Sequence, residues 1–329
     1  MNKLNVSLSP HVHSGNSVQG CMRDVLIALV PALIVSFLFF GMGALVVTLT
    51  SVAACVLFEF LIQKFLLKTT PSICDLSAVL TGVLLAFNVP SNLPIWIIII
   101  GALVAIGVGK MAFGGIGCNI FNPALVGRVF LLIAYPVQMT TWPVSGTTSY
   151  IVPDAETGAT PLALLKNWAA AGNADEAAQI MSQLPSSLDM LIGKTGGAMG
   201  EVCAIALLIG FVYMLIRKTI TWHIPVSILL SAFVMALVCY EWNVEVALMQ
   251  LLSGGMMLGA IFMATDYVSS PMTRKGMWIY GISIGVLTII IRRFGAYPEG
   301  MSFAILIMNA FTPLINAYVK PTRFGVTKK

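Results

Sequence analysis

A threonine placed to hold a phosphate has the clearest chemical potential in this sequence. Thr160 precedes Pro161, and residues 162–171 have the composition of a short helix that Gly172 would end. Thr160 is therefore predicted to be the N-cap, whose side-chain oxygen accepts a hydrogen bond from the first turn. The same position lies at the positive end of the helix, where backbone N–H groups favour a phosphate. A plain helix cap and a phosphate anchor are both open from the residues alone.

A second group of candidates is polar or ionisable and lies within apolar stretches. Arg128 follows Asn122 by six residues, and Asp266 lies beside Thr265 at a predicted helix break. Ionisable groups inside a membrane are costly, so they are functional candidates by default. Arg128 could neutralise a bound anion or satisfy helix-end carbonyls, and Asp266 could bind an ion. Glu59 lies near the end of its apolar segment and is expected to snorkel in a structural role.

Glycines gather just before Asn119 and Asn122. A glycine-rich run can hold a dinucleotide, but this run has no soluble strand before it and no acidic ribose ligand after it. In a membrane chain, glycine lets a helix or a planar ring approach the backbone closely. The glycines are Gly107, Gly109, Gly114, Gly115 and Gly117.

Cysteine and histidine give no sign of a metal centre. No Cys-x-x-Cys pair occurs, so an iron–sulfur cluster held by this chain is not expected, and the thiols are expected to act as small packing residues. The three histidines are too few and too scattered for a metal site. The residues are Cys21, Cys55, Cys74, Cys118, Cys203, Cys239, His11, His13 and His223.

The composition identifies the class of protein in which these groups work. Of the 329 residues, 58% are apolar and 9% are charged, against about 25% charged in a typical soluble domain. The chain is therefore expected to be an all-α integral membrane protein that crosses the bilayer several times. Its net charge of +5 is then a topology signal to be read loop by loop, and nucleic acid is not expected as a partner.

The apolar pattern predicts about ten transmembrane helices, each of roughly 20 residues. An even number places both termini on one side. The cytoplasm is the expected side, because all but five of the 18 Lys and Arg residues then lie inside. Arg292 and Arg293 disagree, and they are expected to snorkel from a helix end. The predicted spans are 24–41, 44–63, 75–88, 94–110, 119–136, 197–216, 222–240, 243–264, 276–292 and 299–319.

Two short echoes in the sequence indicate that the ten helices form two repeats. Residues 80–94 align with 258–271, and residues 119–123 resemble 309–313. Five helices in each repeat would invert the second copy relative to the first, and helices broken by Pro or Gly at matching positions point to a central binding site. Ordinary helix kinks explain the same breaks equally well.

This topology divides the chain into five parts. The segment with Thr160 is external and contains no Cys, so packing on the membrane domain or on a partner must order it. The polar N-terminus is a poor signal peptide and is expected to stay in the mature protein. The parts are a cytoplasmic segment 1–23, a first five-helix repeat 24–136, an external segment 137–196, a second five-helix repeat 197–319 and a cytoplasmic tail 320–329.

The chain resembles the membrane flavoprotein subunits of the Rnf ferredoxin:NAD oxidoreductase and of the sodium-pumping NADH:quinone oxidoreductase. Asp154, Thr157, Gly158, Ala159 and Thr160 match that family's flavinylation sequence, Asp-x-x-(Ser/Thr)-Gly-Ala-Thr. The length and the brief polar N-terminus are closer to the Rnf type of this subunit, RnfD, than to the quinone-reductase type, NqrB. The resemblance covers the whole chain and includes residues 9–11, 28–32, 113–124 and 264–266.

The resemblance implies that Thr160 carries covalent FMN through its phosphate. A separate flavin transferase would attach it outside the membrane after recognising Asp154, Thr157, Gly158 and Ala159. It also implies a noncovalent riboflavin or other flavin. A site for that flavin or for an ion is expected at Gly114, Gly115, Asn119, Asn122, Arg128 and Asp266.

The resemblance further implies an electron-transfer subunit of a redox-driven Na⁺ or H⁺ translocase in the bacterial inner membrane. Such a chain is not catalytic alone, because it has no nicotinamide fold and no cluster motif. Other Rnf membrane, flavin and iron–sulfur subunits are its expected partners. A transporter or channel with inverted repeats and a purely structural membrane anchor are the alternatives.

Overall fold

The computed structural model describes residues 17–143, 158–170, 174–193, 195–200, 203–295, 297 and 299–321. Within these residues, every element longer than one residue is a helix. In chain order they are α1 (Val18–Leu61), η1 (Ile62–Leu67), η2 (Ile73–Asp75), α2 (Ser77–Phe87), α3 (Ile95–Gly107), η3 (Met111–Phe113), α4 (Pro123–Ala134), α5 (Pro136–Thr140), α6 (Pro161–Ala170), α7 (Ala174–Gln183), α8 (Ser187–Ile192), α9 (Ala204–Ile216), α10 (His223–Cys239), α11 (Val244–Leu252), α12 (Met256–Leu258), η4 (Gly259–Met263), α13 (Arg274–Phe294) and α14 (Met301–Tyr318).

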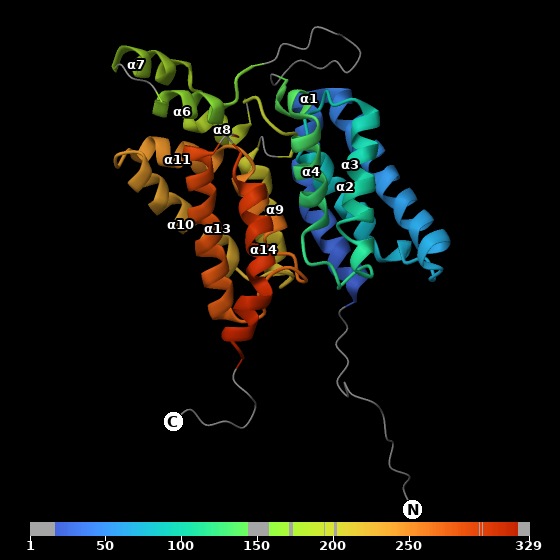
Figure 1. The fold of residues 1–329 in the computed structure, drawn as a ribbon. Helices are drawn as coiled ribbons and strands as arrows, with labels where there is room; N and C mark the ends of the chain where they lie inside the picture. The colour runs from blue at the N-terminus through green and yellow to red at the C-terminus, as the bar shows by residue number, and fades with distance from the viewer. Residues whose placement is uncertain are drawn as a thin grey trace, which may run out of the picture.

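Helix α1 is a hairpin of two arms. Its 44 residues would form a straight rod about twice as long as the hydrocarbon core is thick. Gly41 breaks the helix with φ 61° and ψ −141°, a conformation that glycine adopts far more easily than other residues. In Figure 1 one blue arm rises to the top of the molecule and a second, lighter arm descends beside it. The arms correspond to the predicted spans 24–41 and 44–63.

The helices form two groups that stand side by side. In Figure 1, α1 to α4 (blue to green) lie on one side, and α10, α11, α13 and α14 (orange to red) lie on the other. Within the first group α2 and α3 pack on α1, and α4 packs on α3; within the second, α13 packs along α10 and α14. Helix α9 joins the groups by packing on α1, and α14 also contacts α4. The candidate sites lie along this boundary.

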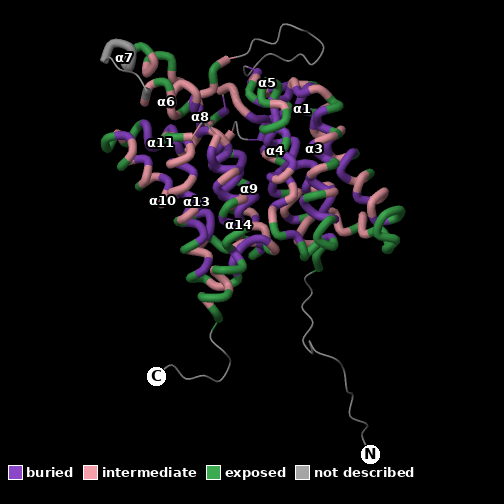
Figure 2. The backbone as a smooth tube through the Cα atoms, viewed as in Figure 1, coloured by how far each residue is buried: buried purple, intermediate pink, exposed green. Residues whose placement is uncertain are grey.

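The outer surface of the helices is apolar, as expected of a protein surrounded by lipid. On the arms of α1, Leu38 is 69% exposed and Leu49 is 60% exposed. Polar side chains such as Ser51 and Thr288 are instead fully buried. Figure 2 shows the buried residues on the surfaces where helices face one another. Such extensive exposed apolar surface would be a liability in water but is the normal lipid-facing surface of a membrane protein.

Fewer helices are complete spans than the sequence pattern predicts. The described residues contain four helices long and apolar enough to cross a membrane, or five if one pair bent by 65° is counted as a single span. Helices α2, α4 and α9 have 11, 12 and 13 residues, below the roughly 17–25 needed. The four are Val18–Leu67, Ile95–Phe113, Arg274–Phe294 and Met301–Tyr318, and the bent pair is Val244–Leu252 with Met256–Met263.

Helices α6, α7 and α8 cover one end of the two groups, opposite the start of α1 and the end of α14 (Figure 1). Two basic side chains tie α6 to α13 at that end. Lys166 Nζ donates to the carbonyl of Gly295 at 2.8 Å, and Arg293 Nη1 donates to the carbonyl of Ala169 at 2.7 Å. Helix α6 is therefore fixed to the membrane-type helices and positions the residues before it.

Arg292 is buried, so the prediction that it snorkels to the surface is wrong. Its side chain is 2% exposed. Its guanidinium donates to the carbonyls of Gln250 at 2.5 Å, Ser253 at 2.9 Å and Gly254 at 2.6 Å. These carbonyls lie at the break after α11, where the helix no longer satisfies them. A cation that disagrees with the positive-inside pattern thus serves as a helix cap.

Close packing between α10 and α13 depends on glycine. A Cβ at Gly285 would lie 2.6 Å from the carbonyl oxygen of Ile228 and 2.8 Å from the nitrogen of Ala232. Both are backbone atoms, so they cannot move aside as a side-chain tip would. We expect Gly285→Ala to lower the free energy of unfolding by about 1–3 kcal/mol, seen as a lower melting temperature in detergent.

Gly107→Ala is the matched control for this prediction. A Cβ at Gly107 meets Ile62 Cδ1 at 3.7 Å, an ordinary contact, and alanine favours a helix over glycine by about 1 kcal/mol. Its melting temperature should equal or exceed that of the wild type. Equal melting temperatures for the two variants would contradict the packing account.

Candidate functional site

Thr160 caps helix α6 as the sequence predicts. Its side-chain oxygen accepts a hydrogen bond from the N–H of Ala163 at 3.3 Å, and its carbonyl accepts one from the N–H of Leu164 at 3.1 Å. Just before it, the N–H of Gly158 donates to the carbonyl of Trp142 at 3.3 Å. The hydroxyl therefore stands at the positive end of a helix of 10 residues, where an attached phosphate would be favoured.

Two hollows open beside Thr160, and Thr160 and Glu299 line both of them. The first encloses about 380 Å³ and is rich in glycine backbone, which suits a phosphate or hydroxyl groups. The second encloses about 550 Å³ and is apolar and aromatic, which suits a planar ring. The first is also lined by Thr195, Gly196, Gly197, Ser253 and Gly254, and the second by Leu132, Met139, Trp142, Gly158, Ala159 and Tyr297.

A buried ion pair lies behind this wall. Arg128, in the middle of α4, is 3% exposed, and its guanidinium donates to Glu299 and to Ser302 at the start of α14. The carboxylate of Glu299 is 14% exposed. The pair joins the first group of helices to the second at the end where Thr160 lies. Sequence reasoning singled out Arg128 but missed Glu299, because 171 residues separate the two partners in the chain.

Interrupted helices from the two groups meet at the centre of the molecule. At the end of α2, Asn88 Nδ2 donates to the carbonyl of Leu84 at 2.6 Å and lies 3.6 Å from Met263 Sδ. Asn122 caps α4 by accepting from the N–H of Ala124 at 3.1 Å. Its amide nitrogen donates to the carbonyl of Met263, at the end of η4, at 3.2 Å. Asparagine side chains thus satisfy helix ends that no water reaches.

The segments 119–123 and 309–313, which resemble each other in sequence, are in contact. In the amide orientation that satisfies its neighbours, Asn309 donates to Tyr280 Oη at 2.6 Å and accepts from the N–H of Asn122 at 3.2 Å. Thr312 Oγ1 donates to the carbonyl of Ser269 at 2.8 Å. The two segments therefore occupy related positions at the boundary between the groups.

A central cavity of about 810 Å³ adjoins this meeting point. Its wall is mostly apolar, and its polar groups come from both groups of helices. Asp266 accepts from Ser269 Oγ at 3.0 Å and from Asn119 Nδ2 at 3.5 Å. A largely apolar cavity of this size with a few convergent polar groups is typical of a small-molecule site. The polar lining residues are Ser77, Thr81, Lys110, Asn119, Asn122, Thr219, Thr265 and Asp266.

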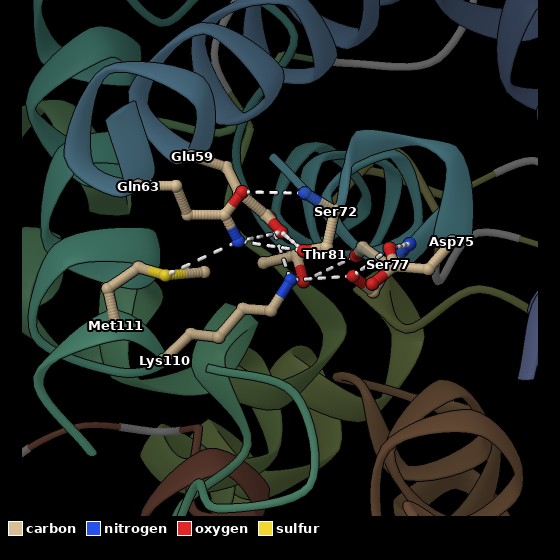
Figure 3. A network of polar contacts seen from close by, with 8 residues as sticks. All are labelled: Glu59, Gln63, Ser72, Asp75, Ser77, Thr81, Lys110 and Met111. Atoms are coloured by element: carbon tan, nitrogen blue, oxygen red, sulfur yellow. Dashed lines mark hydrogen bonds and ion pairs between the residues drawn. The ribbon is translucent and has the colours of Figure 1, made fainter. Parts of the chain in front are cut away.

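The cation at this cavity is paired with a carboxylate behind it. Lys110 Nζ lies 2.7 Å from Glu59 Oε2 and donates to Ser77 Oγ at 2.6 Å. Ser77 Oγ in turn donates to Asp75 Oδ1 at 2.6 Å, and Gln63 Nε2 donates to Glu59 Oε1 at 3.4 Å. Figure 3 shows these side chains converging from α1, η1, α2 and the loop before η3.

Glu59 therefore does not snorkel, and that prediction is wrong. Its side chain is fully buried and that of Lys110 is 3% exposed. The two residues are 51 apart in sequence, so sequence spacing alone could not reveal the pair. Two polar segments beside the membrane-type helices hid a salt bridge inside the protein.

The structure gathers some of the predicted site residues and separates others. Asn119, Asn122 and Asp266 line the central cavity. Gly114 and Gly115 do not line it; with φ 110° and 99° they shape the loop that leads to it. Arg128 lies apart, beside Glu299 and the Thr160 hollows. Gly158, Ala159 and Thr160 lie together, whereas Asp154 and Thr157 lie outside the described residues. Those residues contain no group of three His, Cys, Asp or Glu side chains that could hold a metal ion.

The fold and the two sites define a class: a multi-pass helical membrane protein whose interrupted helices face an internal cavity. The sequence model of the NQR2, RnfD, RnfE family matches residues 5–325. The chain belongs to this family.

Relatives of known name match the chain from end to end. The subunit designated D in the Na⁺-translocating ferredoxin:NAD⁺ oxidoreductase complex of Acetobacterium woodii is 46% identical, over 100% of this chain and 98% of that protein. Its counterpart of the same designation in the proton-translocating ferredoxin:NAD⁺ oxidoreductase complex of Clostridium ljungdahlii is 38% identical over 99% and 98%. The counterpart in the ion-translocating oxidoreductase complex of Escherichia coli is 35% identical over 98% and 99%.

The buried pair behind the central cavity yields a stability prediction. Lys110→Met would leave the Glu59 carboxylate buried without its cation. Removing one partner of such a pair costs about 3–5 kcal/mol, so the melting temperature of the purified protein should fall markedly. Adding Glu59→Gln to Lys110→Met removes the stranded charge and should restore at least half of the loss.

Lys275→Met is the control, since Lys275 is exposed and its loss should change stability by no more than about 0.5 kcal/mol. A double variant as unstable as Lys110→Met alone would show that lost packing, and not the stranded charge, causes the effect.

Proposed function

We propose that this chain is the RnfD subunit of a membrane-bound, ion-translocating ferredoxin:NAD⁺ oxidoreductase of the Rnf type. The observation that carries this proposal is the end-to-end similarity to subunits of such complexes, at 46% and 38% identity. Those relatives are named for Na⁺ and for H⁺ translocation, so the coupled ion is one of these two. Like them, the chain works as one subunit of a complex, with the other Rnf membrane, flavin and iron–sulfur subunits as partners.

We further propose that Thr160 carries FMN covalently through the flavin phosphate, attached by a flavin transferase. Three features support this: the match to the flavinylation sequence, the helix N-terminus at the Thr160 hydroxyl, and the adjoining hollows. The glycine-rich hollow suits the phosphate and ribityl chain, and the aromatic hollow beside Trp142 and Tyr297 suits the ring. The flavin would supply one-electron redox chemistry; the chain's own residues hold it, orient it and limit access of water.

The central cavity is proposed to bind a second, noncovalent flavin such as riboflavin. Its volume of about 810 Å³ lies in the range usual for small-molecule sites. Asn119 and Asp266 supply polar groups for the edge of a planar ring, and the apolar wall supplies stacking surface. Helix α4 links the two sites, because its N-cap Asn122 lines the central cavity and Leu132 lines the aromatic hollow.

The proposed topology has ten membrane segments in two inverted repeats, several of them interrupted helices. The contact between segments 119–123 and 309–313 supports a repeat. Both termini are proposed to face the cytoplasm of a bacterial inner membrane, with Thr160 on the outer side. This follows from the positive-inside pattern and from the position of α6 at the end opposite the start of α1 (Figure 1).

A transporter of small solutes is the second candidate, and the interrupted helices around a central cavity favour it. The two candidates differ in the motif at Thr160, which solute transport does not require. Covalent flavin would therefore decide between them.

Substitution at the attachment site tests the covalent flavin. The chain is coexpressed with its flavin transferase, purified and run on a denaturing gel under ultraviolet light. We expect a fluorescent band at its mass in the wild type and none in Thr160→Ala. Thr195→Ala is the matched control, because Thr195 lines the same hollow and should leave the band intact. A fluorescent Thr160→Ala band would move the attachment to another residue.

Flavin released by acid tests the central cavity. Precipitation keeps covalent flavin with the protein and frees noncovalent flavin into solution. Asn119→Ala removes one polar contact and should weaken noncovalent binding about tenfold, while in-gel fluorescence stays unchanged. Asn92→Ala, outside the cavity lining, should release as much flavin as the wild type. Equal release from all three proteins would exclude a flavin bound at Asn119.

A further inference from the structure

The ion pair beside Thr160 is built from both halves of the protein. Arg128 comes from α4, and its guanidinium donates both to Glu299 and to Ser302 at the start of α14. The Arg128 side chain is 3% exposed and that of Glu299 is 14% exposed. Such burial keeps water from screening the charges, so their balance has a large effect on what else binds there.

Glu299 connects this pair to the attachment site. It shares with Thr160 the wall between the glycine-rich and the aromatic hollows. The guanidinium of Arg128 is therefore one side chain removed from the space that a group on Thr160 would fill.

Attachment of a phosphodiester to Thr160 would upset the charge balance of this wall. The diester adds one negative charge beside the carboxylate of Glu299, and two anions that share a partly buried site repel each other. Arg128 carries one positive charge but five N–H donors in a rigid fork, a geometry suited to carboxylates and phosphates. The same guanidinium can therefore serve both anions.

We propose that Arg128 is the counter-ion of the phosphodiester on Thr160 and that Glu299 is a positioning residue that holds the guanidinium toward the attachment site. This inference rests on the covalent flavin proposed above. Before attachment, Glu299 and Ser302 keep the guanidinium in place; after attachment, the phosphodiester shares it with Glu299.

The competing account is purely structural: the pair ties α4 to α14 and does nothing for the flavin. The two accounts differ in one measurable quantity, the change in melting temperature that flavin attachment causes. A structural tie lowers the melting temperature equally with and without flavin. A counter-ion alters the difference between the loaded and the unloaded protein.

The test compares each variant purified after expression with and without the transferase, with loading measured by in-gel fluorescence before the melt. Arg128→Met should lose at least half of the stabilisation that loading gives the wild type. Arg128→Lys keeps the charge but loses the fork and should lie between the two. Glu299→Gln removes the competing anion and should gain more stabilisation from loading than the wild type does.

Lys166→Met is the matched control, since Lys166 is a cation on α6 that lines neither hollow, and its loading shift should equal that of the wild type. Loading shifts equal to the wild type in both Arg128→Lys and Glu299→Gln would overturn the counter-ion proposal even if Arg128→Met fails to fold. A wild type that shows no fluorescent band would instead overturn the covalent flavin, and this inference with it.

Discussion

Backbone groups at interrupted helix ends must find hydrogen-bond partners where no water reaches them, and this requirement shapes the whole molecule. Asn122 bonds to the carbonyl of Met263, Asn309 accepts from the N–H of Asn122, and Arg292 satisfies three carbonyls after α11. An unmade hydrogen bond in such a place costs several kcal/mol. These contacts fix the ends of short helices at the centre, and so they make a polar-lined cavity possible inside an apolar protein.

Charge follows the same rule. Glu59 pairs with Lys110 at the central cavity, and Arg128 pairs with Glu299 beside Thr160. Each pair joins segments far apart in the chain, and each lies next to a space that could hold a ligand. A buried pair seldom adds much stability compared with apolar packing, so two pairs beside two cavities are better explained by the ligands that those cavities bind.

The sequence predicts local features well and distant pairings poorly. The break at Gly41, the cap at Thr160 and the interrupted helices near Asn122 all follow from nearest-neighbour chemistry, and the structure has them. Glu59 and Arg292 were expected at the surface, because nothing near them in sequence can pair with them; the structure supplies a lysine 51 residues away for one and helix-end carbonyls for the other. Glu299 gave no signal at all, since its importance comes from Arg128 and Thr160. Long-range packing is therefore what converts a recognisable motif into a site.

One short helix connects the two proposed flavin sites, since α4 begins at the central cavity and ends at the hollow beside Thr160. Its 12 residues span about 18 Å. The central claim is that Thr160 anchors one of these flavins, and peptide mass mapping of the chain coexpressed with its transferase tests it most directly. The account predicts that the peptide containing Thr160 gains the mass of FMN less one water, with fragmentation placing the added mass on Thr160. An unmodified Thr160 peptide from a complex active in electron transfer would contradict it.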